Sequence, residues 1–136
     1  MRSEQGWDGV LGIEIDELTS TRVVAHLDVD DRHLQPYGIV HGGVWASVVE
    51  TVASHGAALA ARETTGEMAV VGISNSTDFL RPHRGGRVRA TGTRIFAGRT
   101  QQLWLVEIEQ LSDRKTVARG QLRLQNLSAP PERRPT

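Results

Sequence analysis

The stretch LQPYGIVHGGVWASVVETVAS, residues 34–54, decides most of what the sequence says about the fold. Its first part contains proline and glycine, which predicts a loop over residues 33–40. The pair Gly42 and Gly43 then opens a segment with helical period that continues to Arg62. One carboxylate, Glu50, stands in the middle of this apolar segment, so the chain's only long predicted helix carries a single charged group at its centre.

Around this predicted helix, the residues divide by size. On a helical wheel, the residues on the same side as Glu50 are all small: Gly43, Ala46, Ser47, Ala53, Ser54, Ala57 and Ala61. The opposite side carries the bulky residues Trp45, Val48, Val52 and Leu59. A mid-helix glutamate is usually a solvated surface residue. Because no other charged residue occurs over 44–61, we instead expect Glu50 in a cleft or at an interface, where a carboxylate suits a nucleophile or a general base.

The start of the predicted helix offers a second chemical group. Gly42 and Gly43 expose backbone N–H groups at the positive end of the helix dipole, where an oxyanion can be stabilised without a side chain. The plain alternative is that two glycines only make a tight entry turn. Helix geometry separates the Gly42 amide from Glu50 by about 12 Å. A base and an oxyanion donor must both lie within about 3 Å of one reacting centre. The simplest solution is two antiparallel helices related by a two-fold axis, each lending its N-terminus to the other's glutamate.

The rest of the chain predicts strands. Alternating apolar residues and turn signals place them at 12–19, 22–29, 68–79, 87–96, 101–111 and 116–126. The candidate inward residues of the first two strands are Ile13, Ile15, Val24 and Leu27. Two strands, one helix and four strands predict an α+β domain in which an antiparallel sheet wraps the helix. We expect one domain over residues 1–127 and a disordered tail over 128–136, which is proline-rich and polar.

Composition excludes several classes of site. The 136 residues contain no cysteine, which excludes disulfides, a thiolate nucleophile and a cysteine-based zinc site. The five histidines are scattered without ligand spacing, so we expect no metal. No apolar run has the length of a signal peptide or a membrane span, and we expect a cytoplasmic protein with no membrane partner.

Charge is unevenly distributed in a chain whose formal net charge is zero. Residues 79–99 hold six arginines and no acidic residue, which creates a local positive field. Nucleic acid is not the expected partner, because the whole chain has one lysine and lacks interleaved aromatic and basic residues. A small phosphorylated ligand fits this field better.

Several motifs together resemble one family. QPYGIVHGG at 35–43, with Glu50 nine residues after His41 and Ser54 one turn later, resembles the hotdog-fold acyl-CoA thioesterases. The likeness is strongest to the 4-hydroxybenzoyl-CoA thioesterase branch, which carries a glutamate on the central helix. It covers residues 12–127, and NSTDFLRP at 75–82 is similar to the segment where the family's next strand leaves the active site. The resemblance implies a long helix wrapped by a five- or six-stranded antiparallel sheet, in a homodimer or in a homotetramer built as a dimer of dimers.

The resemblance also implies an activity, the hydrolysis of an acyl-CoA thioester to a carboxylic acid and coenzyme A. Glu50 would act as nucleophile or as base on water, and the Gly42 amide would polarise the thioester carbonyl. Gln35 would lie near the thioester, Ser54 would assist the water or orient Glu50, and His41 would position the loop or the substrate. A histidine just before a helix can equally be structural. Coenzyme A would enter only as part of the substrate, with no separate cofactor.

The remaining predictions concern substrate binding. We expect Gly43 to contact the substrate and Arg81, Arg84 and Arg99 to bind the phosphates of coenzyme A. The acyl group is left open among aryl, phenylacetyl-like, short-chain, medium-chain and carrier-bound groups. Two alternative functions are an enoyl-thioester hydratase or dehydratase of the same fold, and a non-catalytic module that binds acyl-CoA.

Overall fold

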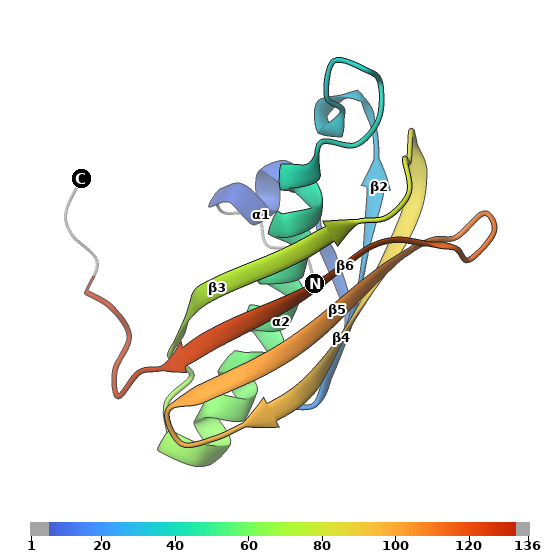
Figure 1. Cartoon of the computed structure of the whole chain (residues 1–136). Helices are drawn as coiled ribbons and strands as arrows, with labels where there is room; N and C mark the ends of the chain where they lie inside the picture. The colour runs from blue at the N-terminus through green and yellow to red at the C-terminus, as the bar shows by residue number, and fades with distance from the viewer. Residues whose placement is uncertain (1–5, 133–136) are drawn as a thin grey trace.

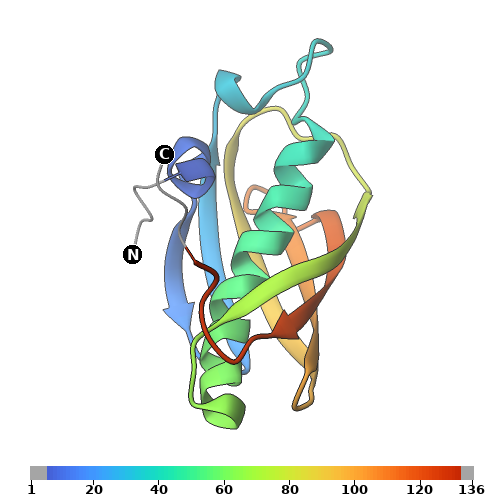
Figure 2. The same ribbon diagram turned by 90° about the vertical axis from the view of Figure 1, so that its left-hand side faces the viewer.

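The computed structural model describes residues 6–132. A short helix α1 (Gly6–Leu11) and strands β1 (Glu14–Leu18) and β2 (Arg22–Val29) precede a 3-10 turn (Asp31–His33) and the long helix α2 (Gly42–Thr65). Strands β3 (Val70–Phe79), β4 (Gly86–Ala97), β5 (Gln101–Gln110) and β6 (Thr116–Asn126) follow. They form one six-stranded antiparallel sheet in the order β1-β2-β4-β5-β6-β3, which curves around α2 (Figures 1 and 2).

This architecture confirms the predicted α+β hotdog fold. All six strands and α2 occur where the sequence pattern placed them, with ends that differ by a few residues. Helix α1 was not predicted, because six residues are too few to display a helical period. Residues 127–132 contain neither helix nor strand. Residues 1–5 and 133–136 lie outside the described part, so the disordered tail at 128–136 stays a prediction. No helix within residues 6–132 has the length and hydrophobicity needed to cross a membrane.

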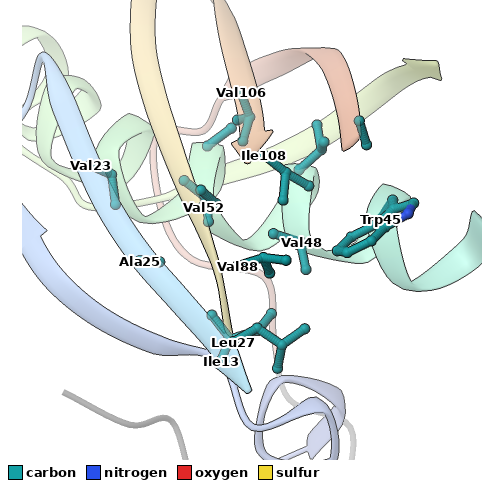
Figure 3. Packing of buried hydrophobic residues seen from close by; sticks show 14 of the residues in the cluster. Ile13, Val23, Ala25, Leu27, Trp45, Val48, Val52, Val88, Val106 and Ile108 are labelled. Atoms are coloured by element: carbon teal, nitrogen blue, oxygen red, sulfur yellow. The ribbon is translucent and has the colours of Figure 1, made fainter. Parts of the chain in front are cut away.

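The core lies between the bulky face of α2 and the concave face of the sheet (Figure 3). Trp45, Val48 and Val52 are buried there, as the helical wheel predicted, in one cluster with side chains from the strands of the sheet. Leu59 was wrongly assigned to this face and is only half-buried.

One inward position in the first strands was also wrong. Ile13, Ile15 and Leu27 belong to the core, as predicted. Val24 is buried but lies outside the core cluster, and it lines a hollow on the outer face of the sheet with His26. Side chains alternate across a strand, so a core that contains Leu27 requires its odd-numbered neighbours and excludes Val24.

Helix and sheet approach each other closely at Gly56. A Cβ atom at Gly56 would lie within 2.8 Å of both the Trp104 ring and the Val23 side chain. The fully buried Trp104 indole donates to Gln102 Oε1 (2.8 Å), and Gln102 donates to the carbonyl of Ala57 (2.9 Å). These bonds satisfy the buried polar groups and fix the distance between α2 and β5.

We predict that Gly56→Ala lowers the free energy of unfolding, measured in urea. The gain in helix propensity of about 1 kcal/mol is outweighed by an overpacking cost of about 1–3 kcal/mol. In a Trp104→Phe background, which removes the contacting ring atoms, the part of that cost due to Trp104 should vanish, while the contact with Val23 remains. A Gly56→Ala protein more stable than the wild type would show that the helix can move away from Trp104.

Candidate active site

The N-terminus of α2 presents one free backbone amide. His41 is the N-cap residue, and its Nδ1 accepts a hydrogen bond from the Gly43 N–H (2.8 Å). The Val44 N–H bonds to the His41 carbonyl (2.9 Å). Within residues 6–132, the Gly42 N–H has no hydrogen-bond partner. Of the two glycine amides predicted to contact the substrate, Gly42 is therefore the one available to bind an oxyanion.

Gly42 opens into a cleft of about 420 Å³. Two polar residues line it, Gln35 and Arg81, and both were predicted from the sequence. Its other walls are apolar: Ile39 and Val40 from the loop before α2, Trp45 from α2, Phe79 at the end of β3, and Leu80 and Pro82 after it. The Phe79 ring lies so close to Gly42 that a Cβ at residue 42 would come within 2.5 Å of it. A larger residue at this position would therefore require the Phe79 ring to move.

The loop that carries Gln35 is held by its own hydrogen bonds. Gln35 N–H donates to the Ile39 carbonyl (2.8 Å), and Gln35 Oε1 accepts from the Tyr37 N–H. Arg84 donates to the carbonyl of Gly38 (3.3 Å), so its guanidinium also holds the loop. The Gln35 side-chain NH₂ has no partner in the described part of the chain. It is therefore free to donate to a ligand in the cleft.

Arg99 lies elsewhere. It sits in the turn between β4 and β5, where its carbonyl accepts from Asn126 at the end of β6 (3.0 Å). β6 pairs there with Val70, at the start of β3, whereas the cleft lies at the other end of β3 beside Phe79. Within one chain, the structure brings Arg81 and Arg84 to the loop and cleft but not Arg99.

Glu50 lies two turns along α2 from the cleft and is exposed in the single chain. Its carboxylate oxygen lies beside Gly72 of β3, 3.4 Å from where a Cβ would be. The expected enclosure of Glu50 is therefore absent from one chain alone. Ser54, one turn further, is half-buried and lines a separate hollow with Met68 and Val70. The predicted site residues thus form two groups, one at the cleft and one on the small-residue side of α2.

Strand β3 runs along this small-residue side in the direction opposite to α2. Gly72 lies beside Glu50, the Asn75 side chain donates to the carbonyl of Ala46 (2.9 Å), and Phe79 reaches Gly42. The Asn75 side chain in turn accepts from Thr77 (2.7 Å). The sequence indicated this segment only through its family likeness. It gave no sign that Asn75 joins β3 to the helix between Gly42 and Glu50.

The outer face of the sheet carries a second hollow, but its charges satisfy one another. His26 lies between the carboxylates of Glu14 and Asp16, at 2.7 Å from each. Arg87 donates twice to Asp28, and these hydrogen bonds hold the pKa of the Asp28 carboxyl below its usual range. Because the charges are paired, this hollow offers less attraction to an anionic ligand than the cleft beside Arg81.

Comparisons with known proteins give the family. The model of the thioesterase superfamily matches residues 37–117. A Mycobacterium tuberculosis protein named "Putative esterase Rv1847" is 47% identical over 126 residues, which are 92% of this chain and 89% of the relative. Its solved structure aligns with a TM-score of 0.85 at 43% identity, covering 92% of this chain and 98% of the other.

Two further relatives carry more specific names. The 1,4-dihydroxy-2-naphthoyl-CoA hydrolase of Escherichia coli is 33% identical over 100 residues, 74% of this chain and 71% of the relative. The structure of the Haemophilus influenzae thioesterase HI1161 aligns with a TM-score of 0.76 at 36% identity, covering 85% of this chain and 78% of the other.

The chain belongs to the thioesterase superfamily. The resemblance drawn from the sequence is confirmed, and so is the expectation of an enzyme that hydrolyses thioesters.

We predict that His41→Ala lowers the free energy of unfolding by about 0.5–2 kcal/mol, because the N-cap acceptor for the Gly43 amide is lost. His41→Asn, which keeps a side-chain acceptor at the N-cap, should recover most of this loss. Urea unfolding of the two variants measures the difference. Equal stability of His41→Ala and the wild type would show that the cap bond contributes nothing.

Proposed function

We propose that this chain hydrolyses an acyl-CoA thioester at a site shared between two subunits. The observation that carries the proposal is the pairing, on one helix, of a free Gly42 amide and an exposed Glu50. Eight residues of helix keep them about 12 Å apart. A second copy, related by a two-fold axis across the helix, would bring Glu50 of the partner subunit to the Gly42 amide.

The sheet provides a surface for such a partner. Strand β3 is an edge strand, and within residues 6–132 it pairs only with β6. It exposes Val71 (37%) and Ile73 (49%) along its ten residues. A long exposed apolar edge invites another strand. Pairing of β3 with its own copy would continue the sheet and place the small-residue sides of the two α2 helices together.

The chemistry then follows from the two groups. The Gly42 N–H donates to the thioester carbonyl oxygen and stabilises the negative charge that develops on it. As a general base, the partner's carboxylate takes a proton from water while the water oxygen bonds to the carbonyl carbon. The carbon–sulfur bond breaks as the tetrahedral intermediate collapses, and the proton passes to the departing thiolate. If Glu50 instead attacks directly, an anhydride forms and water cleaves it with the same overall balance.

The other predicted residues take supporting roles. The free NH₂ group of Gln35 would donate a hydrogen bond to the substrate in the cleft. Ser54 of the partner subunit would assist the water or orient the glutamate, and His41 holds the helix N-terminus. The Gly43 amide is bonded to His41, so Gly43 would contact the substrate through its backbone surface and not as a hydrogen-bond donor.

For coenzyme A we assign Arg81 to the phosphates, because it is the arginine that lines the cleft. Arg84 supports the loop and could contribute charge from there. Arg99 would take part only if the assembly brings it near from another subunit. Assembly of two dimers into a tetramer remains an expectation of the family resemblance.

The names of relatives favour an aromatic acyl group. An Arabidopsis thaliana relative, 38% identical over 100 residues, is named 1,4-dihydroxy-2-naphthoyl-CoA thioesterase 2, and the Escherichia coli relative is named for the same substrate. We therefore propose an aryl-CoA as the preferred substrate over acetyl-CoA.

We predict that Glu50→Gln lowers kcat on benzoyl-CoA by about 10² or more while binding is retained, as removal of a base or nucleophile does. Release of the coenzyme A thiol measures turnover, and calorimetry measures binding. Glu63→Gln, which alters an exposed glutamate at the end of α2, is the matched control and should keep full activity. Undiminished turnover by Glu50→Gln would end this mechanism.

A second prediction isolates the Gly42 amide. Proline is favoured at the first residue of a helix but has no N–H, so Gly42→Pro removes the donor and keeps the helix start, although proline also requires the Phe79 ring to move. Gly42→Ala keeps the N–H and crowds Phe79 in a similar way. We expect Gly42→Pro to lose about 10²–10³ in kcat and Gly42→Ala to lose clearly less. Equal losses would show that the effect comes from crowding and that the amide is not the donor.

A further inference from the structure

Helix α1 holds a tryptophan beside the start of α2. The Trp7 indole N–H donates to Ser47 Oγ (2.8 Å), and Ser47 Oγ donates to the Gly43 carbonyl (2.7 Å). The next residue, Asp8, also joins α1 to α2, because its carboxylate accepts a hydrogen bond from the Thr51 hydroxyl (2.6 Å). Despite these bonds, 58% of Trp7 is exposed, whereas Trp45 (2%) and Trp104 (0%) are buried. An aromatic ring is thus held in place with much of its surface unused.

Trp7 forms one wall of a hollow of about 450 Å³, called here the Trp7 hollow. Besides Trp7, its lining includes the apolar side chains of Leu34 and Val44 and the side chains of Arg32, His33 and His41. It shares no lining residue with the cleft that holds Gln35 and Arg81. The two spaces meet at consecutive residues, since Gly42 lines the cleft and Gly43 lines the Trp7 hollow. The free amide therefore stands between two separate spaces.

The two spaces differ in charge. The Arg32 guanidinium in the Trp7 hollow is already engaged, by the Val10 carbonyl (3.0 Å) and the Asp30 carboxylate (3.2 Å). In the cleft, Arg81 is exposed and makes no direct ion pair within residues 6–132, although the Asp113 carboxylate lies near enough to interact with its charge. Phosphates would go to the side of Arg81. The Trp7 hollow is better suited to an uncharged group.

We propose that the Trp7 hollow receives the acyl group of the substrate and that Trp7 selects for an aromatic ring there. The inference rests on the proposed function, which puts the thioester carbonyl at the Gly42 amide. A thioester carbonyl has two substituents, and the coenzyme A arm takes the cleft beside Arg81. The acyl group then enters the other space, where a ring can stack on the fixed indole. Such aromatic pairs contribute beyond simple burial, and a ring already held in place loses little entropy on binding.

The first experiment uses Trp7 as its own reporter. Since Trp45 and Trp104 are buried, acrylamide quenching of tryptophan fluorescence reports mainly on Trp7, and Trp7→Phe should remove the quenchable component. In the Glu50→Gln protein, which prevents turnover, benzoyl-CoA should protect Trp7 from acrylamide. Acetyl-CoA, which carries the same coenzyme A, should not. Equal protection by both would mean that the hollow holds the coenzyme A arm, and no protection by either would leave it outside the substrate site; each result overturns the proposal.

The second experiment tests selection in the otherwise wild-type enzyme. Trp7→Ala should lower kcat/KM on benzoyl-CoA about tenfold and leave that on acetyl-CoA within twofold. Trp7→Phe, which keeps a ring, should recover most of the loss. Val10→Ala removes another exposed apolar side chain of α1 and should leave kcat/KM unchanged on both substrates. A parallel loss on both substrates would reduce Trp7 to a structural role.

Failure of this inference and failure of the proposed function can be told apart. Protection of Trp7 by benzoyl-CoA is a binding measurement and does not depend on which residue performs hydrolysis. Active Glu50→Gln would contradict the catalytic role, and unselective protection would contradict only the acyl subsite.

Discussion

The geometry of a single α-helix constrains the whole account. Gly42 and Glu50 belong to one rigid element, and the rise per residue fixes the distance between the amide and the carboxylate. No side-chain rotation closes a gap of about 12 Å. Two groups suited to one acyl transfer therefore cannot meet in the chain that carries both. In the proposed mechanism, assembly of two chains is therefore part of the chemistry, and Glu50, which is exposed in the single chain, is open to a partner subunit.

The fold serves this constraint by treating the two sides of α2 differently. The sheet closes over the bulky side, where Trp45 and Val48 are buried and Gly56 allows contact with Trp104. The small side is left between α1 and β3, each fastened by a few polar bonds, such as Trp7 to Ser47 and Asn75 to Ala46. A helix that had to be buried all round would have no room for Glu50. On the small side, Ala53, Ala57 and Ala61 are buried within the single chain and Glu50 is exposed, so the surface offered to a partner centres on Glu50.

Most of this arrangement could be read from the sequence, because local patterns determine it. The Gly42-Gly43 pair marks the start of the helix, and the lone charge at Glu50 marks the side of the helix to which we assign the catalytic carboxylate. What could not be read depends on positions in space. Arg81 and Arg99 both belong to one arginine-rich stretch, but β4 runs between them for twelve residues, which is about 40 Å of extended chain. The stretch is a cluster in sequence and not in structure.

Val24 was misplaced because the alternation in β2 fits two registers until the partner strand is known. The role of Trp7 depended on an unpredicted short helix that meets residue 47 from forty positions away.

The most direct test of the shared site is a heterodimer made from one Gly42→Pro chain and one Glu50→Gln chain, purified through two different tags. Each homodimer should be nearly inactive. In the heterodimer, one of the two sites combines an intact Gly42 with an intact glutamate from the other chain, so about half of the wild-type kcat should return. Both sites would stay defective if amide and carboxylate acted within a single chain, and a heterodimer no more active than its two parents would contradict the account.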